Sequence, residues 1–204
     1  MKEFVELGKT AVVIVDMQND YCSEKGYFAQ NLGLNVDPIQ TAAAKIKKFV
    51  EAARNKGLPI IFTKMTEDKE HVAQNLKRKM ELTHGDFFAK PGSWGHDLYE
   101  IVPENTDLVL EKNHFDAFTN PDLEKILKEK GIENLIVCGF TTIVCVDTTV
   151  RSAFSKGFNI VLPKDLVATV GEREKQHNAT LSVLGFHFAY ASTSEDIENI
   201  LEGE

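Results

Sequence analysis

Short apolar runs alternate with helix-like segments along almost the whole chain, and this alternation is what most constrains the fold. Residues 10–16 form a continuous apolar run that ends in an aspartate, as expected of a strand buried on both faces. Residues 38–56 then carry apolar side chains at helical spacing, and Gly57 follows as a stop signal. Further strands are predicted at 58–63, 107–112, 134–139, 158–163 and 188–191. Such alternation predicts a three-layer α/β/α fold with a mainly parallel, six-stranded sheet.

We expect residues 1–204 to form a single domain, because the length suits one hydrophobic core and no linker, repeat or low-complexity tract interrupts the chain. A long excursion at 65–106 departs from the usual short connection between two strands. Residues 67–82 within it have a helical pattern, and Trp94, the only tryptophan, lies between glycines. The excursion is either a surface elaboration, a cover over a functional site or an oligomer contact.

Charge and composition narrow the class of protein. The net charge of −8 argues against a nucleic-acid partner, and no apolar run approaches the roughly 20 residues that span a membrane. The first residues lack the apolar core of a secretory signal. Cys22, Cys138 and Cys145 are too few for a disulfide framework, which favours a reducing cytoplasm. No cysteine–histidine cluster suggests zinc, so we expect no metal and no other cofactor.

Three polar side chains lie at the carboxyl ends of predicted strands or just after them. Asp16 ends the first strand, Lys112 ends the third, and Cys145 follows the fourth at the start of a helix. Taken singly, they have ordinary explanations as a turn carboxylate, a surface ammonium and a core thiol. Because the carboxyl ends of parallel strands share one edge, the three could meet in one site.

Such a meeting would suit nucleophilic catalysis by a cysteine. Backbone N–H groups at the helix start and the Lys112 ammonium are expected to lower the pKa of the Cys145 thiol. The Asp16 carboxylate could accept the thiol proton and return it later. The sequence therefore predicts a cysteine hydrolase.

At these residues the chain resembles the isochorismatase-like cysteine hydrolases, a superfamily of Rossmann-like topology that includes nicotinamidases and ureidoacrylate, biuret and N-carbamoylsarcosine amidohydrolases. The likeness spans roughly residues 10–194. Three motifs carry it: Asp16-Met17-Gln18-Asn19-Asp20, the stretch from Lys112 to Phe118, and the stretch from Gly139 to Val146.

The resemblance implies a catalytic triad of Asp16, Lys112 and Cys145. It also implies an oxyanion hole built from the backbone N–H groups of Thr141 and Cys145, with a cis peptide between Phe140 and Thr141. The small-molecule substrate would contact loop residues, for which the candidates are Gln18, Tyr21, Trp94, His114, Phe115 and Phe118. Relatives commonly form dimers or tetramers, so the resemblance also implies a homodimer or homotetramer.

Departures from the family motifs bear on the substrate. Nicotinamidases share an Asp-x-His metal motif after the second strand, where this chain has Met65 and Glu67. Residues 91–95 resemble a Pro-Gly-Thr-Trp-Gly segment of the metal-free amidohydrolases. We therefore expect a metal-independent amidohydrolase that cleaves a small, linear amide, ureido or carbamoyl compound through a thioester.

Other functions stay open from the sequence. They are an isochorismatase-type hydrolase, for which Lys90 and Arg151 are the candidate basic residues, a nicotinamidase-like amidase and a non-catalytic relative. A flavodoxin-like nucleotide binder is disfavoured, since no glycine-rich loop follows the first strand.

Overall fold

The structure, a computed structural model, describes residues 2–83 and 87–203, and its framework is a parallel sheet. Seven strands run in the order β3-β2-β1-β4-β5-β7, with β6 paired to the end of β4. Every pairing between these strands is parallel. The strands are β1 (Thr10–Val15), β2 (Ile60–Met65), β3 (Leu108–Lys112), β4 (Asn134–Phe140), β5 (Asn159–Pro163), β6 (Val167–Ala168) and β7 (Tyr190–Ser192).

Helices cover both faces of the sheet and also lie beyond its carboxyl edge. The α-helices are α1 (Asn19–Cys22), α2 (Tyr27–Gln30), α3 (Asp37–Asn55), α4 (Gln74–Thr83), α5 (Pro121–Glu129), α6 (Asp147–Ser155), α7 (Glu174–His187) and α8 (Ser194–Glu202). Short 3-10 helices are η1 (Lys2–Phe4), η2 (Trp94–His96), η3 (Ala117–Thr119), η5 (Lys164–Leu166) and η6 (Gly171–Arg173), and η4 (Thr142–Val146) is a π-helical turn.

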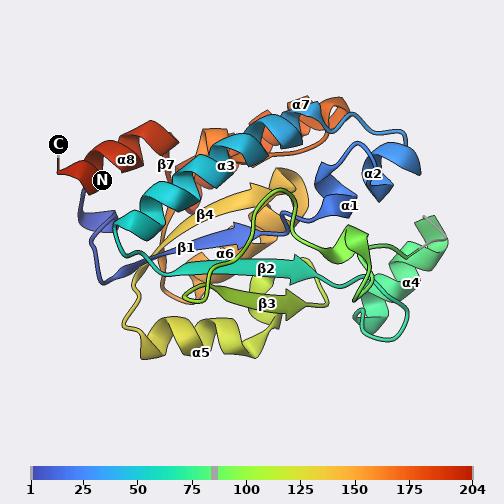
Figure 1. The fold of residues 1–204 in the computed structure, drawn as a ribbon, viewed down its shortest axis with the longest axis horizontal. Helices are drawn as coiled ribbons and strands as arrows, with labels where there is room; N and C mark the ends of the chain where they lie inside the picture. The colour runs from blue at the N-terminus through green and yellow to red at the C-terminus, as the bar shows by residue number, and fades with distance from the viewer. Residues whose placement is uncertain (1, 84–86, 204) are drawn as a thin grey trace.

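The two faces of the sheet build separate hydrophobic cores because side chains alternate along each strand. Val12 and Ile14 of β1 pack with α3 and α8, whereas Val13 and Val15 pack with α5 and α6. Figure 1 shows α3 and α8 on one side of the sheet and α5 on the other. The central strands β1 and β4 are buried at every position, which explains their continuous apolar sequences. The predicted three-layer α/β/α architecture is confirmed.

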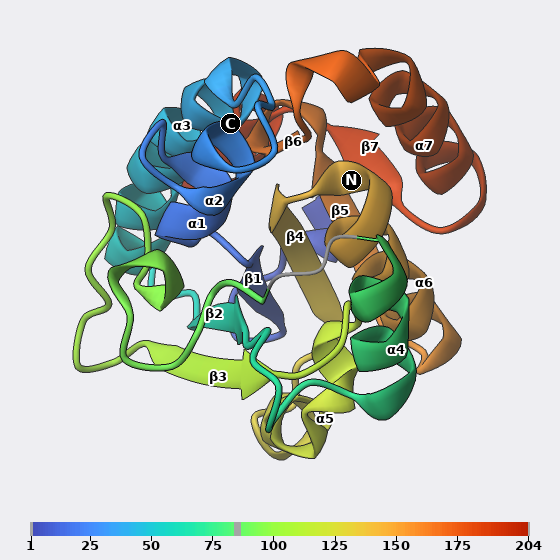
Figure 2. The same ribbon diagram turned by 90° about the vertical axis from the view of Figure 1, so that its right-hand side faces the viewer.

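The carboxyl edge of the sheet gathers segments that are far apart in the sequence. The strand arrows in Figure 1 point toward α1, α2 and α4, while both chain termini lie at the opposite end. Figure 2 views this edge, with α1 and α2 on one side of β1 and β4 and with α4 on the other. The excursion at 65–106 supplies α4 and η2; its residues 84–86 lie outside the described residues.

Six of the seven strands match the predicted ones, and the two-residue β6 was not predicted. The helix predicted over 67–82 begins only at Gln74. The reason is local, because the Asp68 carboxylate accepts hydrogen bonds from the backbone N–H groups of Glu70 and His71 and closes a turn there. The sequence analysis also missed the short helices α1 and α2 and the C-terminal helix α8.

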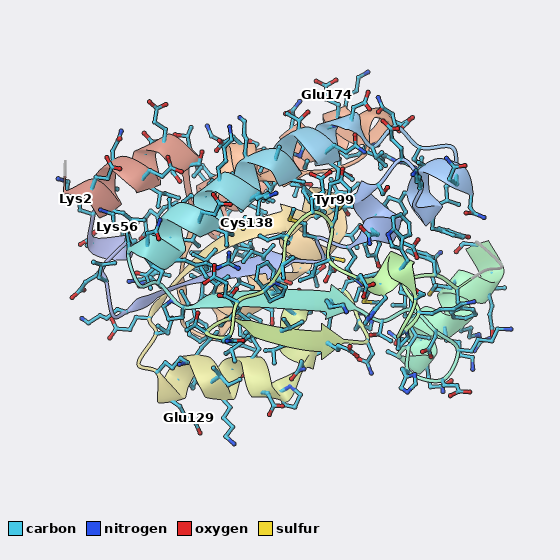
Figure 3. All side chains as sticks on the ribbon, viewed as in Figure 1. Lys2, Lys56, Tyr99, Glu129, Cys138 and Glu174 are labelled. Atoms are coloured by element: carbon cyan, nitrogen blue, oxygen red, sulfur yellow. The ribbon has the colours of Figure 1, made fainter. Side chains whose placement is uncertain are left out.

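None of the described helices combines the length and the apolar character needed to cross a membrane. All three cysteines are free thiols. Cys138, labelled in Figure 3, lies on β4 beneath α3 and is fully buried in the core, where its thiol contacts the carbonyl of Val13 at 3.7 Å.

Candidate active site

Asp16 begins the site, one residue beyond the end of β1. Its backbone adopts a φ of 51°, in the left-handed region that aspartate tolerates better than most residues. The backbone N–H of Asp16 donates to Thr63 on β2 at 3.1 Å, and the Thr63 hydroxyl donates to Oδ1 of Asp16 at 3.1 Å. The carboxyl group is buried and fixed from β2, at the edge where the parallel strands end.

Lys112, the last residue of β3, faces Asp16 across β2. Its Nζ lies 2.7 Å from Oδ2 of Asp16 and donates to the carbonyls of His114 at 2.9 Å and Phe115 at 3.1 Å. These three acceptors match the three protons of an ammonium group. Burial alone would lower the pKa of Lys112, but the Asp16 carboxylate and the Cys145 sulfur outweigh it and raise the pKa. Lys112 therefore stays charged although it is buried.

Cys145 lies in the π-helical turn η4, which leads from β4 into α6. Its sulfur lies close enough to Asp16 and Lys112 for both charges to act on the thiol. Burial and the Asp16 carboxylate raise the pKa of Cys145 well above its usual range, and Lys112 only partly opposes them. The expectation of a lowered thiol pKa was therefore wrong: in the resting site a neutral thiol faces the carboxylate.

Burial also raises the pKa of Asp16, against the lowering effects of Lys112, Cys145 and Thr63. A carboxylate of raised pKa is a better proton acceptor than an exposed aspartate. An arrangement of this kind allows a thiol to donate a proton to a carboxylate while an ammonium holds the charge.

The turn that carries Cys145 depends on close packing between β1 and β4. Gly139 has a φ of 112°, and a Cβ atom there would lie 2.2 Å from the carbonyl oxygen of Val15. Only glycine lets β4 pass so near the end of β1. The next peptide bond, between Phe140 and Thr141, is cis, which confirms the bond that the family resemblance implied.

A cavity of about 510 Å³ opens at this edge, and Cys145 forms part of its wall. Tyr21 and Phe115, two of the six predicted substrate contacts, also line it. So do Leu76 and Met80 of α4, which shows that the excursion borders the site of its own chain. Cys145 is only 7% exposed, so the cavity is its route to a small molecule.

The other four predicted substrate contacts do not line this cavity. Gln18 is fully buried, and its amide bonds the backbone N–H and carbonyl of Met65 at 2.7 and 3.0 Å. Trp94 is 51% exposed, and its carbonyl accepts hydrogen bonds from the side chain of Asn19 at 2.7 Å and from the N–H of Asp97 at 3.1 Å. In this structure Gln18 and Trp94 join the excursion to the segment after β1.

His114 and Phe118 also interact with neighbouring protein groups outside the cavity wall. The His114 ring accepts from the N–H of Phe115, and its carbonyl holds Lys112. Phe118 packs in the core on the other face of the sheet, stacked on Phe158. Motif position alone could not tell these residues from the wall residues of the cavity.

Glu67 is a site residue that the sequence analysis considered only as a departure from a metal motif. It lies two residues beyond β2, is 5% exposed and lines the cavity, and its Oε1 accepts from the Tyr21 hydroxyl at 3.2 Å. Burial raises the pKa of Glu67 to about 8, against the lowering effects of the Tyr21 hydrogen bond and Lys112. Its place just after a central strand was the available signal.

His177 was also missed as a neighbour of the site. This half-buried residue of α7 makes a 3.0 Å hydrogen bond through Nδ1 with the hydroxyl of Thr142, the first residue of η4. No sequence pattern pairs the two positions, because 35 residues separate them. His177 thus braces the turn that carries Cys145.

The structure also shows where possible metal ligands and anion-binding basic residues lie. Across residues 2–83 and 87–203, no three His, Cys, Asp or Glu side chains are grouped as metal ligands would be. Arg151, which the sequence analysis considered as a receiver for an acidic substrate, is bonded to Asp147 at 2.9 Å and stacks on Phe188. Lys90 is exposed and does not line the cavity beside Cys145.

The chain matches the isochorismatase domain over residues 10–196. It is 33% identical to the ureidoacrylate amidohydrolase RutB of Azorhizobium caulinodans, over 94% of this chain and 90% of that protein. It is 30% identical to the ureidoacrylate amidohydrolase RutB of Agrobacterium fabrum, over 95% and 90% of the two chains.

Solved structures have the same fold. A cysteine hydrolase from Pseudomonas syringae superposes with a TM-score of 0.81 at 21% identity, covering 96% of this chain and 93% of that one. N-carbamoylsarcosine amidase from Thermoplasma acidophilum gives a TM-score of 0.72 at 24% identity, with 91% and 96% covered. With its matched domain, its fold and its edge of polar residues, this chain belongs to the isochorismatase family of hydrolases.

Proposed function

We propose that this protein is a cysteine-dependent amidohydrolase that cleaves a C–N bond in a small amide, ureido or carbamoyl compound. The observation that carries the proposal is the buried Asp16 carboxyl, which is paired with the Lys112 ammonium at 2.7 Å and interacts electrostatically with the nearby Cys145 thiol. The sulfur borders a cavity large enough for a small substrate. The relatives named as ureidoacrylate amidohydrolases support the same class of reaction.

In the first half of the reaction, Cys145 attacks the carbonyl carbon of the substrate. A C–S bond forms, the thiol proton passes to Asp16, and the carbonyl electron pair moves onto oxygen. We propose that the backbone N–H groups of Thr141 and Cys145 donate to this oxyanion; both residues line the cavity. The C–N bond then breaks, and the leaving nitrogen takes the proton from Asp16.

In the second half, water releases the acyl group. Asp16 accepts a proton from the water, whose oxygen attacks the thioester carbon. The C–S bond breaks, the sulfur regains the proton, and the acyl group leaves as a carboxylic acid, or as a carbamic acid when the substrate is a ureido or carbamoyl compound. Lys112 keeps its charge throughout, because the carbonyls of His114 and Phe115 accept two of its hydrogens and Asp16 faces the third.

Ammonia-release assays over ureidoacrylate, biuret, N-carbamoyl amino acids and simple amides test the proposal. We expect turnover of at least one of these compounds by the wild-type protein and none by Cys145→Ala, with an acyl adduct on Cys145 visible by mass spectrometry. The matched control is Cys138→Ala, since Cys138 is a free thiol enclosed in the core. Full activity in the Cys145→Ala protein would refute the covalent mechanism.

We also propose that the protein works in the cytoplasm and as a homodimer or homotetramer. The three free thiols support a reducing compartment. Exposed Val183 and Phe186 on α7 support self-association. Light scattering after size exclusion tests the assembly, and a mass near the 22.8 kDa of one chain would contradict it.

A further inference from the structure

The orientation of a substrate follows from which site residues border the cavity. Cys145 and Thr141 line it, whereas Asp16 and Lys112 are not among its described lining residues. The leaving nitrogen must lie near Asp16 to receive its proton, so it points toward the enclosed side of the sulfur. The acyl group must then occupy the cavity. The leaving nitrogen lies on the enclosed side, where only small substituents on it would fit.

The described wall of this cavity is mainly apolar. One side is formed by Phe28 of α2 and by Leu34, which follows α2, and the facing side by Leu76 and Met80 of α4. Figure 2 shows α2 and α4 on opposite sides of this edge. Leu76 and Met80 are buried, and so is Phe88, another lining residue. An acyl group that enters here contacts carbon on both sides.

The charged residues that line the cavity do not place a charge against its apolar inner wall. Lys79 and Arg173 lie at exposed positions, where solvent reaches them. Glu67 is buried, but its carboxyl is hydrogen-bonded to Tyr21 beside the reacting end. Because burial raises the pKa of Glu67 to about 8, this group is largely uncharged at neutral pH.

We propose that the preferred substrate is a primary carboxamide with an unbranched apolar acyl chain, which lies between Phe28 and Leu34 on one side and Leu76 and Met80 on the other. This inference rests on the proposed amidohydrolase function. Ureido acids such as ureidoacrylate fit the same wall poorly, because their N–H and carboxylate groups would lose water without gaining partners there.

A chain-length series tests this preference. We expect kcat/KM for acetamide, butanamide and hexanamide to rise about fourfold per added methylene, the factor that corresponds to ~0.8 kcal/mol of buried CH₂. Hexanamide, with four more methylenes, should then exceed acetamide by roughly 250-fold, and it should also exceed ureidoacrylate. Calorimetry on Cys145→Ala should show the same order of affinities in the absence of turnover.

Two wall variants and one control locate the effect. Met80→Gln should lower the hexanamide-to-acetamide ratio by roughly tenfold, because a polar amide replaces the thioether at similar volume. Ile143→Asn, at a half-buried lining position, should lower it too and keeps the test open if Met80→Gln does not fold. Leu82→Gln is the control, since Leu82 is 78% exposed on the same helix and does not line the cavity; its ratio should match the wild type.

The outcomes separate the two proposals. A flat chain-length series, with Cys145-dependent hydrolysis of acetamide or ureidoacrylate retained, overturns the apolar-chain inference and leaves the amidohydrolase function standing. A ratio that falls equally in the Leu82→Gln control also overturns the inference. If no amide or ureido compound is hydrolysed, both proposals fail.

Discussion

Asp16 interacts with Thr63 of β2 and Lys112 of β3, so substituting it should affect both the reaction rate and the stability of the fold. In Asp16→Asn the amide can still hydrogen-bond but can no longer accept the thiol proton. We expect kcat to fall about 10²- to 10⁴-fold. The buried Lys112 ammonium also loses its counter-charge, which should cost about 3–5 kcal/mol of unfolding free energy. Steady-state kinetics and urea unfolding measure the two effects. The control is Asp97→Asn, at an exposed position of the excursion, and equal losses in both variants would contradict the assignment.

Glu67 should make the unfolding free energy depend on pH. Its folded pKa, raised to about 8 from 4.5, means that the folded protein binds a proton that the unfolded chain releases. Stability from this group is therefore full below about pH 4.5 and falls as pH rises to about 8, with a slope of up to about 1.4 kcal/mol per pH unit.

The Glu67→Gln variant should lack that slope, because a neutral amide replaces the titrating acid. Urea titrations from pH 5 to 9 give the difference between the two proteins, which removes contributions from the other buried groups. Glu129→Gln, at an exposed position of α5, serves as the control. If the unfolding free energies of the wild type and Glu67→Gln depend on pH in the same way, the pKa of Glu67 is not raised by folding, and the prediction is wrong.

At the scale of elements, Asp20 connects three segments that border the cavity. Its carboxylate accepts from the N–H of Ala89 at 2.7 Å and from the N–H of Tyr27 at 3.2 Å, and thereby ties α1 to α2 and to the excursion. Asp20→Ala should loosen residues 87–96 by about 1–3 kcal/mol, because two partly buried N–H groups lose the carboxylate that accepts their hydrogen bonds. Hydrogen exchange should speed up there and not in β4; Asp20→Asn, which keeps one acceptor, should give a smaller change. Unchanged protection of Ala89 would contradict this role.

The elements also show what the sequence could predict. The strands around β1 and β4 were predictable because both of their faces are buried, which makes their apolar runs continuous. Asp16, Lys112 and Cys145 were predictable as neighbours because parallel strands end at one edge. The cavity wall was not predictable, because Leu76 of α4 and Phe28 of α2 are brought to the same cavity by tertiary packing, which leaves no periodic pattern in the sequence. For α8 a signal existed, the capping box of Thr193 and Asp196, and it was overlooked.

At the scale of the whole molecule, the three thiols report on whether the chain unfolds as one unit. Cys22 of α1 and Cys138 of β4 are fully enclosed in one core, whereas Cys145 borders the cavity. Iodoacetamide should therefore modify Cys145 in the native protein, slowly because burial raises its pKa, and should reach the other two only through unfolding.

If residues 1–204 form a single domain, Cys22 and Cys138 should become reactive at the same urea concentration, and that midpoint should match the loss of helical circular dichroism. Peptide mapping by mass spectrometry follows each thiol separately. The Cys145→Ala protein supplies the matched control, because removal of the cavity thiol should leave both midpoints together. Modification of Cys22 at a clearly lower urea concentration than Cys138 would show that the edge carrying the site opens before the sheet does, and would contradict a single cooperative unit.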